Sequence, residues 1–111
     1  MERGYSAATA WRNGSPDERG NGYGLKISAV DRDAFLKRTF GSIDLYLSGV
    51  PRPVSVNIHK ASMWEGTCRE LISKEIGAWL MRMGLAPWPK GEPPRFRLVP
   101  RDERRFDVLP A

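Results

Sequence analysis

Cys68 and His59 are the two residues whose types could carry covalent chemistry. A thiolate is a strong nucleophile and an imidazole can accept its proton, so this pair, nine residues apart, could form a catalytic dyad. Each is the only residue of its type in the chain, and no third residue stands out to orient the histidine. A lone cysteine is most often a small buried apolar residue, which favours a structural role for Cys68.

The remaining patterns argue against an enzyme. Asp31 and Asp33 are two residues apart on an expected helix, so their side chains diverge. One cysteine and one histidine supply neither a disulfide nor the usual zinc ligands. The glycines of residues 20–24 have no strand before them and no helix after them, which disfavours a nucleotide-phosphate loop. We therefore predict a protein without catalytic residues, metal or cofactor.

Arginines near the C-terminus point to binding. Residues 95–105 hold five arginines against two acidic residues, and alternation along two strands would place several of them on one face beside each other. Arginine forks on a rigid hairpin can grip phosphates, and an aromatic residue on a proline-stiffened loop can stack on a base. The sequence thus predicts a nucleic-acid-binding module for DNA or RNA, within a larger complex. Its candidate binding residues are Arg95, Arg97, Arg105, Arg101, Lys90 and Trp88.

Two other interpretations stay open for the same residues. The arginines could simply solvate the sheet and pair with nearby acidic residues, with Trp88 closing the core. Alternatively, the chain could be a protein-interaction subunit or an inhibitor, because Trp64 and Trp88 lie in loops beside the main helix and tryptophan often dominates protein interfaces. A homo-oligomer is also compatible with this second interpretation.

The elements that would position these residues follow from the apolar pattern. Alternation predicts strands at 25–28, 42–47, 53–59, 95–100 and 104–110. Two helices are expected between them, one from Ser28 to about Phe40 and one of about four turns from Thr67 to Met83. The order β-α-β-β-α-β-β predicts an α+β domain with a small five-stranded, mostly antiparallel sheet or partly open barrel.

Local signals set the helix ends. Ser28 with Asp31, and Thr67 with Glu70, have the spacing of capping boxes. Gly84 predicts a left-handed cap at the end of the second helix, with Leu85 turned back onto Leu80.

Length and composition set the outer limits. A chain of 111 residues, 41% hydrophobic and 28% charged, fits one globular domain without a membrane-length apolar run. The N-terminus does not have the pattern of a secretory signal, so a cytoplasmic protein is expected. The net charge of +5 suits an anionic partner and also ordinary solubility. Residues 1–22 have no apolar periodicity and predict a flexible arm, with the domain at 23–111. The aromatic residues Tyr5, Trp11 and Tyr23 could dock on the domain or on a partner, and Tyr23 could already belong to the first strand.

Overall fold

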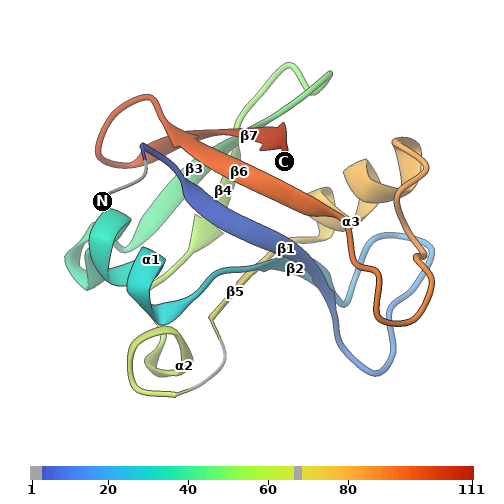
Figure 1. Ribbon diagram of the computed structural model, residues 1–111, viewed down its shortest axis with the longest axis horizontal. Helices are drawn as coiled ribbons and strands as arrows, with labels where there is room; N and C mark the ends of the chain where they lie inside the picture. The colour runs from blue at the N-terminus through green and yellow to red at the C-terminus, as the bar shows by residue number, and fades with distance from the viewer. Residues whose placement is uncertain (1–3, 67–68) are drawn as a thin grey trace.

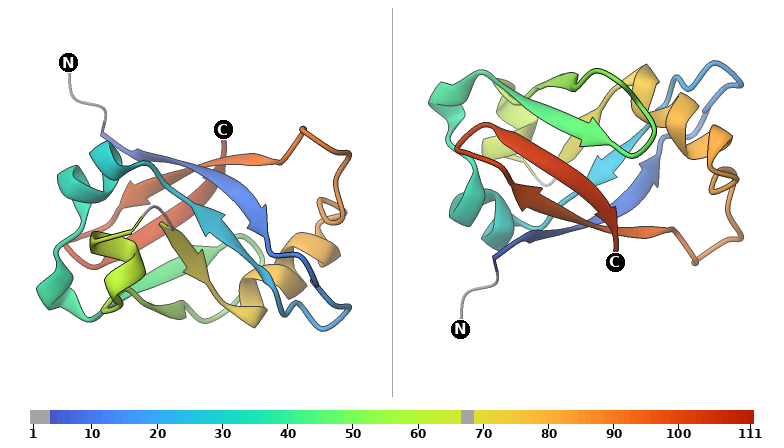
Figure 2. Two further views of the ribbon diagram at one scale, coloured as in Figure 1. Left: turned by 90° about the horizontal axis from the view of Figure 1, so that it is seen from below. Right: turned by 90° about the horizontal axis from the view of Figure 1, so that it is seen from above.

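The protein is an α+β domain built around one mixed sheet that closes almost completely into a barrel (Figures 1 and 2). The computed structural model describes residues 4–66 and 69–111. Its strands are β1 (Ser6–Arg12), β2 (Tyr23–Lys26), β3 (Ser42–Leu47), β4 (Val54–Asn57), β5 (Glu70–Ile72), β6 (Arg95–Pro100) and β7 (Arg105–Pro110). They lie in the order β4-β3-β7-β6-β1-β2-β5, and the two outermost strands, β4 and β5, approach each other. The described chain thus has seven strands where the sequence predicts five.

The largest correction concerns the predicted flexible arm. Residues 6–12 form β1, which lies inside the sheet and pairs antiparallel with both β2 and β6. Ala8 and Ala10 point into the core and are 3% and 5% exposed. Alanine gives only a faint apolar alternation, so the strand depends on hydrogen bonds from two neighbours rather than on a strong pattern of its own.

The two predicted hairpins are confirmed. β3 pairs antiparallel with β4, and β6 pairs antiparallel with β7. In each strand the alternate large apolar side chains enter the barrel, as in Ile43, Leu45 and Leu47 of β3. β3 also pairs with β7, and these two strands run parallel, which makes the sheet mixed.

The first predicted helix is shorter than expected. α1 (Ala29–Phe35) begins at Ser28, whose hydroxyl accepts a hydrogen bond from the Asp31 amide at 3.1 Å. The carboxylate of Asp31 accepts one from the Ala7 amide of β1 at 3.0 Å, so it ties the helix to the sheet. A separate 3-10 turn, η1 (Arg38–Phe40), ends at Gly41.

The main helix, α3 (Lys74–Arg82), begins later than the sequence predicts. Residues 70–72 form the edge strand β5, and Ser73 caps the helix by accepting from the Glu75 amide. Thr67, the predicted cap, lies outside the described residues. The predicted stop is confirmed: Gly84 has a φ of 72°, and the Leu85 amide donates to Leu80 at 2.8 Å. A further short helix, α2 (Ala61–Trp64), precedes β5.

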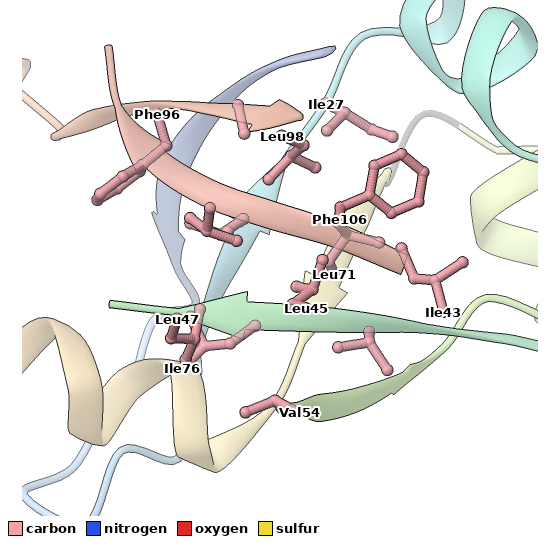
Figure 3. Packing of buried hydrophobic residues seen from close by; sticks show 14 of the residues in the cluster. Ile27, Ile43, Leu45, Leu47, Val54, Leu71, Ile76, Phe96, Leu98 and Phe106 are labelled. Carbon is pink, nitrogen blue, oxygen red and sulfur yellow. The ribbon is translucent and has the colours of Figure 1, made fainter. Parts of the chain in front are cut away.

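The barrel interior is one apolar cluster (Figure 3). Side chains from the inner faces of the strands meet Ile76, Trp79 and Leu80 of α3. The Trp79 indole is 3% exposed, lies 5.3 Å from the Phe96 ring and donates to the Ser48 carbonyl at 2.9 Å. Because the interior is filled in this way, any ligand site must lie on the outer surface of the barrel. No helix in the described residues is long and apolar enough to cross a membrane.

Candidate nucleic-acid interface

The register of the last hairpin separates the predicted arginines into two groups. Arg95 lies opposite Ala111 at the open end, whereas Arg105 lies opposite Arg101 beside the turn. Six residues of extended strand separate the two ends, which is about 20 Å. The prediction that Arg105 lies beside Arg95 and Arg97 is therefore wrong, although all three lie on the outer face of the sheet.

The arginines beside the turn are paired with carboxylates. Arg105 Nε donates to Asp102 at 2.6 Å, and Arg101 Nε donates to Asp107 at 2.9 Å. The Arg101 guanidinium also lies 3.7 Å from the centre of the Tyr46 ring. These contacts raise the pKa of both arginines, through the carboxylate hydrogen bond first in each case. For Arg101 and Arg105 the structure agrees with the interpretation that the arginines pair with nearby acidic residues, because both already have carboxylate partners within the hairpin.

Arg95 and Arg97 have different surroundings. Within residues 4–66 and 69–111, no carboxylate lies within ion-pair distance of either side chain. Arg97 Nε donates to the Pro110 carbonyl at 3.3 Å, and its guanidinium lies 5.6 Å from the centre of the Tyr5 ring. Arg95 is exposed. Both positive charges are therefore available to an anion.

A lysine from β2 extends this positive surface. Thr9 of β1 lies between Arg95 on one side and Lys26 on the other, and all three occupy the outer face. Two strand spacings separate Arg95 from Lys26, so their Cα atoms are about 10 Å apart. Lys26 is exposed, and no carboxylate of the described chain is within ion-pair distance of it.

Two hollows flank β1 on this face and share the same floor. The small side chains of Ala7 and Thr9 line both hollows, which have volumes of about 490 and 530 Å³. The larger contains Lys26 and Arg69 with the Asp31 carboxylate, and the smaller contains Arg95 and Arg97. We call this surface the basic groove, defined by Ala7, Thr9, Lys26, Arg69, Arg95 and Arg97.

The surrounding elements leave the groove open. Figure 1 shows β1 and β6 side by side at the front of the view, with α1 near one end of the pair and α3 near the other. No helix of the described chain crosses these two strands in that view. Small residues on β1 and long basic side chains around it thus line two open hollows on this part of the sheet, one of which also contains the Asp31 carboxylate.

The predicted loop residues have unequal positions. Trp88 packs against the core and meets the Tyr23 ring edge-on at 5.9 Å, so it acts as the clasp between the α3 end and the sheet. The Ala86–Pro87 peptide bond before it is cis. Lys90 is exposed and precedes Gly91, which lines the smaller hollow. Of this pair, only Lys90 is near the basic groove and free of core packing.

Trp64, the other tryptophan proposed as an interface anchor, also has partners inside the chain. Its indole donates to the Ile58 carbonyl at 2.9 Å, and the Arg32 guanidinium lies 5.3 Å from its ring centre. It packs against the core cluster. The protein-interaction alternative depends on two loop tryptophans, and both of them pack against the core of the chain itself.

Of the two residues singled out for catalysis, only His59 lies in the part of the chain that the structure describes. His59 is exposed, while Cys68 lies outside the described residues. Among residues 4–66 and 69–111, no three His, Cys, Asp or Glu side chains gather to hold a metal ion.

Sequence reasoning missed Lys26 and Arg69 as members of the candidate interface. Alternation around Leu25 and Ile27 does place Lys26 on an outer face, which was the available signal. Its neighbours across the sheet do not follow from the sequence, because the sequence predicts a flexible arm where β1 lies. Comparisons with protein-family models, with curated proteins and with solved structures give no significant match.

Proposed function

We propose that the protein is a nucleic-acid-binding module that grips phosphates with the basic groove and performs no reaction of its own. One observation carries the proposal: Arg95, Arg97, Lys26 and Arg69 surround a shared floor of small residues and have no carboxylate ion-pair partner among the described residues. Polyanions are the partners that such a surface attracts most strongly.

The proposal narrows the set of binding residues. Arg101 and Arg105 are left out because each already has a carboxylate partner in the turn, so a phosphate contact there would replace an existing interaction and would not add a new one. Trp88 is excluded because it packs on the core. Lys90 remains at the margin of the groove, and a partner protein in a larger complex would have the rest of the barrel surface available.

The test compares two double variants of the same hairpin. R95A/R97A removes two unpaired charges from the groove, and R101A/R105A removes two paired charges from the turn, so the change in net charge is equal. Fluorescence anisotropy with labelled single- and double-stranded DNA and RNA, at low and near-physiological salt, measures affinity and its salt dependence.

We expect the groove variant to lower affinity at least tenfold and to reduce the slope of log K against log salt by about 1.4 to 1.8, the value for two phosphate contacts. The turn variant should change affinity by less than threefold. Equal losses from both variants would show that only net charge matters. Absence of binding by the parent protein at near-physiological salt would refute the proposal and return the search to a protein partner.

A further inference from the structure

Trp11 differs from the other three tryptophans in its place in the barrel. Trp64, Trp79 and Trp88 all belong to the core cluster or pack directly against it, whereas Trp11 does not. Alternation along β1 sends Ala8 and Ala10 inward and places Trp11 on the outer face, where it is half-buried. A large aromatic residue there is unexplained by packing of the interior.

The position opposite Trp11 has no side chain. Gly24 of β2 pairs with Trp11, and Ile72 of β5 follows Gly24 in the same row across the sheet. A Cβ on Gly24 would lie 2.5 Å from the Leu71 carbonyl oxygen, so close approach of β5 requires glycine there. This row across the sheet therefore contains the Trp11 indole, no side chain at Gly24, and the side chain of Ile72, which is 45% exposed.

This apolar row lies directly beside the cations of the basic groove. Thr9, between Arg95 and Lys26, is two residues before Trp11 on the same face of β1. The two rows are therefore about 7 Å apart, so one ligand can contact both. Cations next to a half-buried indole and the exposed Ile72 suit a ligand with a charged backbone and flat, accessible bases.

We propose, on the basis of the function proposed above, that the preferred ligand is a single-stranded nucleic acid whose phosphates lie over Arg95, Thr9 and Lys26 while one base stacks on Trp11. In a duplex the base faces are covered by their neighbours, so only an unpaired base can stack on the indole. Selectivity for single strands thus comes from Trp11, and the groove supplies phosphate affinity.

The experiment uses the full chain with oligo(dT) and a duplex of equal length. Trp11→Ala should lower affinity for oligo(dT) by about 5- to 150-fold, the usual loss for one stacked base, and change duplex affinity less than twofold. Trp11→Phe keeps a stacking surface and should retain most of the affinity. Circular dichroism and thermal melting of each variant confirm that the barrel is intact.

A second readout does not depend on the alanine variant folding. Stacking quenches indole fluorescence, so oligo(dT) should quench the parent protein and the control variant Trp88→Phe, but quench Trp11→Phe much less. The stacking proposal would be overturned by equal quenching in Trp11→Phe and the parent, or by an equal loss of single-strand and duplex affinity in Trp11→Ala. Neither result would contradict phosphate binding by the basic groove. If no nucleic acid binds the parent, both proposals fail.

Discussion

Gly77 in α3 and Gly20 in the loop after β1 pack backbone against backbone. A Cβ on Gly77 would lie 2.2 Å from the Gly20 carbonyl oxygen, and one on Gly20 would lie 2.2 Å from that of Lys74. Gly20 also has a φ of 100°, a region that side chains disfavour. The contact fixes the loop between β1 and β2 on the helix, so this loop is a packed part of the barrel.

Gly77→Ala should therefore destabilise the protein even though alanine favours helix. The gain in helix propensity is about 1 kcal/mol, while forcing a methyl group into a close-packed contact costs about 1–3 kcal/mol. Because the added methyl group would lie 2.2 Å from the Gly20 carbonyl oxygen, a backbone atom, we expect the packing cost to exceed the gain in helix propensity. Urea unfolding measures the balance, and a variant more stable than the parent would contradict the packing.

Trp79→Ala should remove about 3–5 kcal/mol from the free energy of unfolding, because it empties the end of the core beside Phe96. It also leaves the Ser48 carbonyl without its indole donor. Trp79→Phe restores part of the volume and should lose clearly less. Chemical denaturation of both variants tests the order, and equal losses would mean that the hydrogen bond outweighs the packing.

Lys26→Ala should weaken nucleic-acid binding by removing one phosphate contact. We expect the slope of log K against log salt to fall by about 1 without a change in thermal stability. Lys37→Ala is the matched control, because Lys37 is also exposed but follows α1 and lines neither hollow of the groove. Identical slopes for Lys26→Ala and Lys37→Ala would remove Lys26 from the interface.

Asp102→Asn should flatten the acid side of the stability profile. The hydrogen bond from Arg105 lowers the pKa of Asp102 below its ordinary value of 3.8. A carboxyl with a lowered folded-state pKa stabilises the fold above the unfolded value, and this stabilisation disappears as the pH falls through the folded value. Melting temperatures from about pH 6 to about pH 2.5 should fall less steeply for the variant than for the parent.

Glu103→Gln serves as the control for that measurement, since it removes a carboxylate from the same turn that has no ion pair among the described residues. Its acid profile should follow the parent. If Asp102→Asn also follows the parent, the ion pair with Arg105 does not contribute to stability.

Local pattern by itself determined the two hairpins and the end of α3. Alternation in residues 42–47, 54–57, 95–100 and 105–110 is strong because each strand presents large side chains to the core, and this signal needs no knowledge of neighbouring strands. The Gly84 cap is likewise a property of a few consecutive residues. The general α+β class follows from the order of these elements.

Tertiary structure alone decided β1, β5 and the grouping of the cations. β1 presents alanines inward and β5 has three residues, so both are held by hydrogen bonds to strands distant in sequence, which no local window contains. Strand register places Lys26 and Arg95 on either side of Thr9. It also places Arg105 about 20 Å from Arg95, at the other end of the hairpin. Charge count was readable from the chain, but which charges are paired and which face one another is set only when the sheet closes.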